Sequence, residues 1–342
     1  MRLKIKKSDS FKFSKKYLDL IPKSRVYDVA NKTPITFAAN LSSKLKNDVF
    51  LKREDMQPIF SFKIRGAYNK IANLNPQQQK RGVITASAGN HAQGVANACK
   101  KLKVPCFIVM PVTAPEIKVK SVKRFGSKVL LHGDNFDQAS KKARQMAKEQ
   151  MLEFIEAFDD PLTIAGQGTV GKEILDEHND LDVIFVPVGG GGLLAGISAW
   201  AAQTQKKTKI YGVEVEDSAC LVEAIKADKR VRLREVGLFA DGVAVERIGK
   251  NNFDVIRECV DGVITVSIDE LCAAVKDIFE DTRVLSEPAG ALALAGLKKY
   301  SAKISNKRLL AISSGANVNF ERLSYIVERS EVGENREKLL SI

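Results

Sequence analysis

The sequence predicts an α/β protein with two open, twisted, mainly parallel sheets flanked by helices. Short runs of β-branched apolar residues alternate with stretches whose apolar residues recur at helical spacing, which is typical of parallel strands joined by helices. Most of these runs end in glycine or polar residues. A chain of 342 residues is also longer than one small core requires. We therefore expect a large and a small lobe, with the functional site between them.

Seven strands and three helices stand out. The strands carry β-branched residues and are expected at residues 82–88, 104–111, 127–133, 183–189, 209–216, 262–267 and 308–314. The helices have apolar residues three and four positions apart and are expected at residues 91–102, 135–150 and 268–283. These elements alternate along most of the chain, as the fold class requires.

The lobe boundaries are expected at two turn signals. One is EDMQ at residues 54–57, and the other is the IEAFDDP segment at residues 155–161. They bracket a small lobe at residues 55–154, so that residues 1–54 and 155–330 form the large lobe. Residues 331–342 are expected to form a C-terminal tail.

Composition limits the class of protein. A hydrophobic fraction of 44% and a charged fraction of 28% are typical of a soluble globular chain. No apolar run is long enough to cross a bilayer, and the basic N-terminus lacks a following apolar region. The five cysteines are scattered and never spaced as C-x-x-C. We expect a cytoplasmic protein with no membrane association, no disulfide framework and no metal cluster.

The net charge of +13 raises the question of nucleic-acid binding. The lysines concentrate in the first 23 residues and between residues 100 and 128. Neither run is interleaved with aromatic residues, and no zinc-finger, RNP or basic-zipper pattern is present. We interpret both runs as solvated surface and expect no nucleic-acid partner, with a basic binding protein as the weakest alternative.

Lys63 lies between Phe62 and Ile64 in the stretch PIFSFKIRGAY. Its ammonium group could reach water from the first turn of a helix, as lysines commonly do. Alternatively it is buried, because desolvation lowers the pKa of a lysine and leaves an amine able to form a Schiff base. The stretch alone favours the first interpretation.

Four consecutive glycines, Gly189 to Gly192, join a buried strand to a helix that starts at about Leu193. Without side chains the backbone can approach a phosphate closely and direct several amides toward it. A second interpretation is a dinucleotide fingerprint, since Gly190, Gly192 and Ala195 satisfy G-x-G-x-x-A. Glu214 on the next strand would then bind a ribose. This interpretation predicts a nicotinamide-dependent dehydrogenase.

Two further strand ends carry polar residues. Ser87, Ala88, Gly89, Asn90 and His91 bridge a strand to a helix, where backbone amides could hold a carboxylate and Asn90 could reach a phenolic oxygen. The same residues would also suit an ordinary helix cap, with His91 as a core histidine. Ser313 and Ser314 close another strand. A serine there could bond a ring nitrogen or be a plain strand end.

An amine nucleophile, a phosphate cradle, a carboxylate loop and a neutral hydroxyl together describe a site for pyridoxal phosphate and an amino acid. No H-E-x-x-H, G-x-S-x-G or P-loop motif competes with this interpretation. We therefore expect pyridoxal 5′-phosphate as the cofactor and no catalytic metal.

Six segments carry a resemblance to a known family: SFKIRGAY, TASAGNHAQGVA, VPVGGGGLLAG, LFADGVAV, SEPAGALALAG and SSGANVNF. From about residue 20 to residue 340 the chain resembles threonine dehydratases (threonine ammonia-lyases). These are pyridoxal phosphate enzymes of the tryptophan-synthase-β-like class. The resemblance implies β-elimination of L-threonine to 2-oxobutanoate and ammonia, and of L-serine to pyruvate, at the first step toward isoleucine. It also implies a homo-oligomer, either a dimer or a tetramer.

The resemblance also implies a role for each site residue. Lys63 would carry the internal aldimine and, once freed, remove the Cα proton as a general base. Phe62 would pack against the ring, and Asn90 would bond its O3′ atom. The phosphate would be held by Gly189, Gly190, Gly191, Gly192 and Leu193. Ser314 would meet the pyridine nitrogen, and a neutral hydroxyl there favours elimination over transamination. The substrate carboxylate would be held by Ser87, Ala88, Gly89, Asn90 and His91.

Three departures refine the expected activity. Serine racemases, the nearest alternative together with serine dehydratases, carry a serine where this chain has Ala88, so we expect poor racemisation. The racemase cation site needs a second acid six residues after the first, but Cys220 follows Glu214 at that distance. Biosynthetic threonine dehydratases often continue into a regulatory domain that binds isoleucine, whereas this sequence stops at Ile342. We expect no isoleucine inhibition through such a domain.

Overall fold

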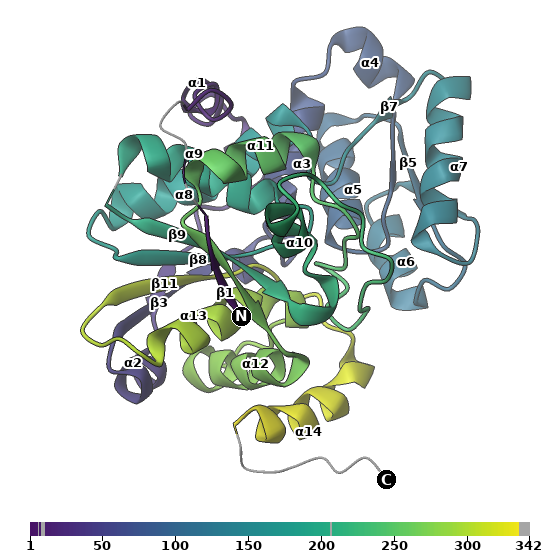
Figure 1. Cartoon of the computed structure of the whole chain (residues 1–342). Coiled ribbons are helices and arrows are strands. Elements are labelled where there is room, and N and C mark those ends of the chain that lie inside the picture. Colours follow the sequence, from purple (N-terminus) through teal and green to yellow (C-terminus); the bar gives the residue numbers. More distant parts are fainter. Residues whose placement is uncertain (6, 8–10, 206, 335–342) are drawn as a thin grey trace.

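The computed structural model describes residues 1–5, 7, 11–205 and 207–334 (Figure 1). Two sheets form the framework. The large sheet has the strand order β1-β10-β9-β8-β11-β3-β2, and the small sheet has the order β6-β5-β4-β7. Neighbouring strands run parallel except in the pairs β1–β10 and β2–β3. The predicted fold class is confirmed.

The strands are β1 Arg2–Lys4, β2 Ile35–Phe37, β3 Asp48–Arg53, β4 Val83–Ala86, β5 Cys106–Met110, β6 Lys128–Leu131, β7 Glu153–Phe154, β8 Val183–Pro187, β9 Lys209–Val215, β10 Gly262–Val266 and β11 Arg308–Ser313. All seven predicted strands are present. Strands β1, β2, β3 and β7 were not predicted from the sequence. Of these, β1, β2 and β7 have only two or three residues, and β3 ends in two charged residues that are buried in the structure.

The helices are α1 Tyr17–Leu20, α2 Ala39–Leu45, α3 Lys63–Ala72, α4 Pro76–Arg81, α5 Asn90–Leu102, α6 Glu116–Lys123, α7 Phe136–Glu149, α8 Pro161–Glu177, α9 Gly192–Thr204, α10 Cys220–Lys226, α11 Lys250–Cys259, α12 Ile268–Thr282, α13 Pro288–Ser301 and α14 Leu323–Gly333. Single 3₁₀ turns lie at Val26–Asp28, Glu54–Met56, Glu216–Ser218 and Phe320–Arg322. The three predicted helices are α5, α7 and α12, each within one residue of its expected ends.

Helices cover both faces of the large sheet. One apolar cluster packs β8 against α8, α9 and α11, and a second packs the opposite face against α12 and α13. The small sheet lies between α3 and α5 on one side and α7 on the other. Because both faces are dry, a strand such as β8 is buried along its whole length, which explains its continuous apolar sequence.

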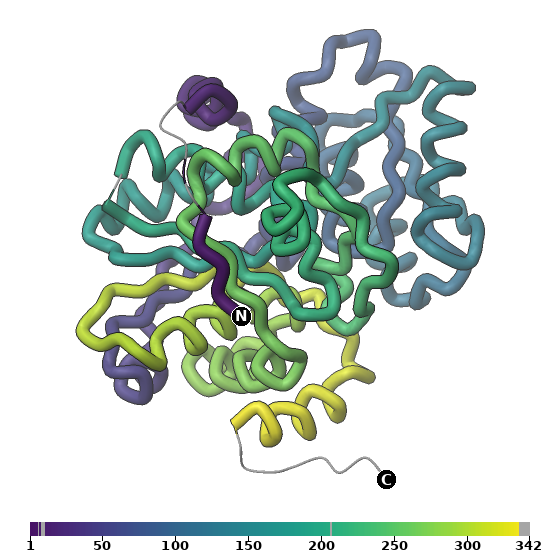
Figure 2. Tube along the Cα trace, viewed as in Figure 1, coloured from purple at the N-terminus to yellow at the C-terminus, as the bar shows by residue number. Residues whose placement is uncertain are grey.

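Figure 2 shows the chain entering the large sheet, building the small sheet and then returning. The strands of the small sheet all lie between residues 83 and 154, and those of the large sheet lie outside this range. The lobe boundaries themselves stay a prediction. Residues 331–333 of the expected tail complete α14, and residues 335–342 lie outside the described residues. Among the described residues, no helix is long and apolar enough to span a membrane.

Candidate active site

Lys63 is fixed at the junction between the two sheets by a short pairing of backbone segments. Ser61 forms an isolated antiparallel bridge with Gly315, just past the end of β11. The amide of Phe62 donates to the carbonyl of Ser314 at 3.2 Å. Lys63 follows directly as the first residue of α3. The sequence neighbours of the lysine therefore bring it to the carboxyl end of a central strand, where ligands of open α/β sheets gather.

Helix α3 is held closely between two other helices. A Cβ atom on Gly94 of α5 would lie 2.9 Å from the carbonyl oxygen of Lys63, and one on Gly166 of α8 would lie 2.8 Å from that of Arg65. Both separations are too short for a side chain, so glycine is required at each contact. The approach of α5 places its N-terminus, which carries Asn90, beside the start of α3.

The amine of Lys63 contacts backbone rather than an acidic group. Its Nζ atom donates to the carbonyl of Ala157 at 3.1 Å and lies 5.2 Å from the ring centroid of Phe62. Burial lowers the pKa of Lys63 to about 8, although the charge of Glu287 opposes the shift. Lys63 is half-buried with its amine turned to a backbone carbonyl, which favours the buried interpretation over the one in which it extends into solvent.

The glycine loop reaches the same place from the large sheet. Gly191 has a φ of +89°, in the left-handed region, and α9 begins at Gly192. A Cβ atom on Gly190 would lie 2.2 Å from the Phe158 ring. Phe158 follows Ala157, whose carbonyl accepts from Lys63. Glycine is therefore required at position 190. The loop packs against the residue that directly follows Ala157, the hydrogen-bond partner of the lysine amine.

The amides of this loop are free to bind an anion. Within the described residues, none of the backbone N–H groups from Gly189 to Leu193 donates a hydrogen bond. The carbonyl of Gly190 is instead fixed by the side chain of Asn252 at 2.6 Å. Unpaired amides at the start of a helix are a ready site for phosphate. The residues present thus fit the phosphate of the expected cofactor.

Asn90 is the first residue of α5 and is held from both sides. Its Nδ2 atom donates to Oε1 of Glu287 at 2.6 Å, and its Oδ1 atom accepts from Nδ2 of Asn317 at 2.7 Å. The amide of Glu287 in turn donates to the carbonyl of Gly315. Asn90 is therefore connected to the segment that fixes Lys63.

Glu287 is a site residue that the sequence reading missed. Its side chain is buried, and burial raises its pKa to about 7, although the bond from Asn90 opposes this shift. It precedes Pro288 at the start of α13. An acid before a proline at a helix start is common for reasons of helix stability alone, so its position gave no functional signal.

The segment Ser87 to His91 divides into two parts. Ser87, Ala88, Gly89 and Asn90 are half-buried, and a Cβ atom on Gly89 would meet no atom within 4 Å. This part borders open space that a ligand can occupy. His91 is buried, and its Nε2 atom lies 3.1 Å from the carbonyl of Ile155. Burial, reinforced by the charge of Lys63, lowers its pKa to about 3, so the ring is neutral. The alternative of a core histidine is correct for this side chain.

Ser313 and Ser314 differ in their surroundings. The hydroxyl of Ser314 donates to the carbonyl of Ala289 at 3.2 Å, and its carbonyl accepts from Phe62. The hydroxyl of Ser313 is buried and has no hydrogen-bond partner among the described residues. Ser314, not Ser313, therefore borders the segment that carries Lys63.

Glu214 does not offer a free carboxyl group, as a ribose-binding acid would. It is fully buried in β9, and its carboxylate accepts from the amides of Leu221 at 2.8 Å and Val222 at 2.9 Å. Both oxygens are thus used to hold the first turn of α10. Burial raises the pKa of Glu214 to about 8 despite these bonds. The geometry gives no support to a dinucleotide site.

The comparisons with known proteins decide between the two interpretations. The family described as "Pyridoxal-phosphate dependent enzyme" matches residues 26–315. The chain belongs to this family. The expectation of a pyridoxal phosphate enzyme is confirmed, and the dehydrogenase interpretation is wrong.

Relatives of this pyridoxal phosphate enzyme include the biosynthetic L-threonine dehydratases of Pasteurella multocida and Escherichia coli. They are 53% and 51% identical to it, each over 328 residues, 95% of this chain and 64% of the relative. The chain thus spans a little under two thirds of their length. The resemblance inferred from the sequence motifs is confirmed.

Solved structures give the same relationship. The processed form of threonine deaminase isoform 2 from Solanum lycopersicum superimposes with a TM-score of 0.93 at 43% identity, covering 96% of each chain. Maize serine racemase superimposes with a TM-score of 0.85 at 29% identity, covering 93% of this chain and 98% of the racemase. The fold is therefore shared by enzymes of both names.

Proposed function

We propose that this enzyme catalyses the β-elimination of L-threonine to 2-oxobutanoate and ammonia, and of L-serine to pyruvate. The observation that carries the proposal is the amine of Lys63, which has a lowered pKa and donates to the carbonyl of Ala157, next to the Phe158 ring that packs on the glycine loop. The names of the relatives that match over 95% of the chain favour threonine as the substrate and a biosynthetic role toward isoleucine.

Each group of the cofactor has a matching group in the site. Lys63 would bond to its aldehyde carbon, and the unpaired amides of Gly189 to Leu193 would hold its phosphate. Phe62 would lie against its ring, and Asn90 would donate to its phenolic oxygen. When bound, pyridoxal phosphate withdraws electrons from the substrate Cα and so acidifies its proton.

Lys63 would move the proton at Cα. A lysine with an ordinary pKa is almost fully charged near neutral pH and cannot act as a base. The pKa of about 8 for Lys63 brings the neutral amine within reach of the working pH. The carbonyl of Ala157, which accepts from this amine, would orient it.

The open segment at the start of α5 would bind the substrate carboxylate. Of the five residues Ser87, Ala88, Gly89, Asn90 and His91, the last two and Ala88 would contribute free backbone amides. The amide of Ser87 donates to the carbonyl of Val109 at 3.2 Å, and that of Gly89 donates to the Ser87 hydroxyl at 3.2 Å. The buried ring of His91 would take no part, since it is neutral and occupied by Ile155. Ala88 supplies no hydroxyl, so the second acid that racemisation needs is missing at this position.

Ser314 would meet the pyridine nitrogen by exchanging its present bond to the carbonyl of Ala289. A hydroxyl carries no charge and leaves the ring nitrogen largely unprotonated. That weakens electron withdrawal and suits elimination, in which the leaving hydroxyl takes the electrons. We further propose that the protein is a cytoplasmic homo-oligomer, either a dimer or a tetramer. The cofactor would lie between a small lobe at residues 55–154 and a large lobe formed by residues 1–54 and 155–330.

The activity is tested by product formation. Purified protein reconstituted with pyridoxal phosphate should form 2-oxobutanoate from L-threonine and pyruvate from L-serine, in equal amounts with ammonia. D-Serine should accumulate from L-serine far more slowly than pyruvate. Racemisation as fast as elimination would support the racemase alternative, and no keto acid from either amino acid would refute the proposal.

A further inference from the structure

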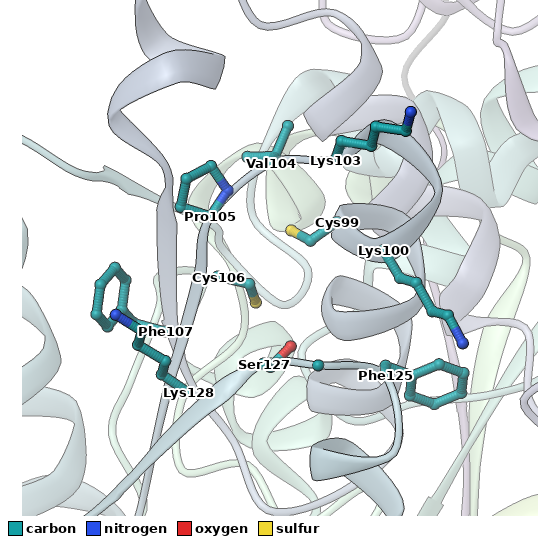
Figure 3. Close-up of a pocket in the computed structure, with 11 residues that line it drawn as sticks. Cys99, Lys100, Lys103, Val104, Pro105, Cys106, Phe107, Phe125, Ser127 and Lys128 are labelled. Carbon is teal, nitrogen blue, oxygen red and sulfur yellow. The ribbon is translucent and has the colours of Figure 1, made fainter.

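A pocket of about 260 Å³ lies in the small sheet, away from the candidate active site (Figure 3). It is lined by the C-terminal part of α5, the start of β5 and the turn between α6 and β6. Its floor contains the buried side chains of Cys99, Val104, Cys106 and Ser127. Neither the fold nor the proposed reaction requires two thiols and a hydroxyl to share one pocket.

The two thiols are brought together by a tight turn. Cys99 lies one turn before the end of α5, and Cys106 is the first residue of β5. The amide of Val104 donates to the carbonyl of Cys99 at 3.0 Å and closes the connection. Figure 3 shows both sulfur atoms directed into the pocket from its two sides. Both cysteines are free thiols.

The surroundings favour the charged form of one thiol. Three exposed lysines, Lys100, Lys103 and Lys128, rim the pocket, and no acidic residue lines it. The buried hydroxyl of Ser127 lies next to the sulfur of Cys106 in Figure 3, and hydrogen bonding from it helps to lower the pKa of Cys106. A hydrogen-bond donor beside the sulfur and lysines at the rim of a pocket without acidic residues suit a reactive thiol.

Cys106 also differs from the other cysteines in its acidity. Hydrogen bonding from the Cys99 thiol lowers the pKa of Cys106, although burial opposes the shift. Burial raises the pKa of Cys259 and of Cys272 to about 12, and it also raises that of Cys220. These three cysteines lie in the large lobe and do not line this pocket.

We propose that Cys106 and Cys99 form a redox pair that hydrogen peroxide, entering through this pocket, converts to a disulfide. The Cys106 sulfur attacks one peroxide oxygen, so that an S–O bond forms, the O–O bond breaks and hydroxide leaves to become water. The Cys99 sulfur then attacks the oxidised sulfur, an S–S bond forms, and the oxygen departs as a second water. Two thiols and one peroxide thus give one disulfide and two water molecules.

The test uses the full chain with its cofactor, treated with hydrogen peroxide and then digested with trypsin without reduction. Cleavage after Arg81, Lys100, Lys103 and Lys118 separates the two cysteines into peptides 82–100 and 104–118. The proposal predicts that these two peptides become linked, while Cys220, Cys259 and Cys272 stay alkylatable. A linkage elsewhere, or oxidation spread evenly over all five cysteines, would overturn it.

Two serine variants separate the roles of the pair. Cys99→Ser should leave oxidised Cys106 unresolved, to be trapped by a dimedone-type reagent on peptide 104–118. Cys106→Ser should abolish both the linkage and the trapped adduct, and Cys272→Ser serves as the matched control with wild-type behaviour. In untreated protein, Cys106 should react with iodoacetamide at least about tenfold faster than Cys259. Equal rates would contradict the proposal even if a variant failed to fold.

Discussion

Lys63 and Arg65 are two cations separated by one residue on the same turn of α3, and their surroundings differ sharply. The amine of Lys63 contacts a backbone carbonyl, and burial lowers its pKa to about 8. The guanidinium of Arg65 is fully buried but pairs with Glu54 at 2.8 Å and Glu173 at 2.6 Å. Burial alone would lower the pKa of Arg65 too, but the two carboxylates outweigh it and raise the pKa.

This comparison shows that the partners of a buried cation decide what it does. Lys52 also pairs with Glu173, at 2.7 Å, so two cations and two carboxylates form a closed network beneath α3. The network holds the body of α3, whereas the amine at its N-terminus has a backbone carbonyl rather than a carboxylate as its partner. A buried ion network of this kind positions α3 without itself being a site of reaction.

The largest effect is expected from removing the amine. Lys63→Ala should lower turnover of L-threonine by about 10³-fold or more, since it removes both the attachment of the cofactor and the proposed base. Lys80→Ala, at an exposed lysine of α4, is the matched control and should keep wild-type kcat. Initial rates of keto-acid formation give the comparison. A Lys63→Ala variant that keeps a tenth of the wild-type rate would show that Lys63 is not a catalytic residue.

The second largest effect is expected from breaking the buried ion network around Arg65. Arg65→Met should lower the free energy of unfolding by about 3–5 kcal/mol, because it leaves the carboxylates of Glu54 and Glu173 buried with too little positive charge. Urea unfolding measures the change, with Arg81→Met at an exposed position as the control. A loss equal to that of the control would mean that the network does not fix α3.

Glu287 adds a pH dependence. Its pKa is raised by burial from 4.5 to about 7, so the folded protein keeps a proton that the unfolded chain loses at lower pH. This group therefore destabilises the folded state progressively as pH rises from about 4.5 to about 7, and by a constant amount above that. Glu287→Gln removes this pH-dependent destabilisation. The unfolding free energy of the variant, relative to that of wild type, should therefore increase as pH rises from about 4.5 to about 7.

Urea unfolding at pH 5 and pH 8 tests this sign. Glu116→Gln is the control because Glu116 lies at the surface on α6. A stability difference for Glu287→Gln that is the same at both pH values would show that Glu287 titrates normally.

The smallest effect is expected at Ala88, a half-buried residue just before α5 whose side chain carries no proton donor. Ala88→Ser should raise the rate of D-serine formation from L-serine by about tenfold. The control variant Ser87→Ala changes the neighbouring residue without adding a hydroxyl, so it should not raise the rate of D-serine formation. Chiral chromatography of the product amino acid measures both. No gain in Ala88→Ser would mean that another group limits racemisation.

The fold and much of the site could be read from the sequence because their signals are local. Gly189 to Gly192 stand between an apolar strand and a helix, and Lys63 lies in an apolar stretch. Strand β3 was missed because its buried charges, Lys52 and Arg53, look like surface residues until their partners are known.

Long-range pairing explains the other omissions. Asn90 meets Glu287 from 197 positions away, and Arg65 meets Glu173 from 108 positions away. No local pattern marks Glu287 as part of the candidate site or Glu173 as part of the network that positions α3. The residue types were enough to predict the chemistry. The partners that shift the pKa of Lys63 and of Arg65 are known only once the two sheets are assembled.

The most direct test of the account is chemical fixation of the cofactor. Protein reconstituted with pyridoxal phosphate is reduced with borohydride, digested with trypsin and analysed by mass spectrometry. We predict a pyridoxyl phosphate adduct on Lys63, which blocks cleavage there and yields the single peptide 54–65. An adduct on another lysine, or an unmodified Lys63 in protein that forms 2-oxobutanoate, would contradict the account.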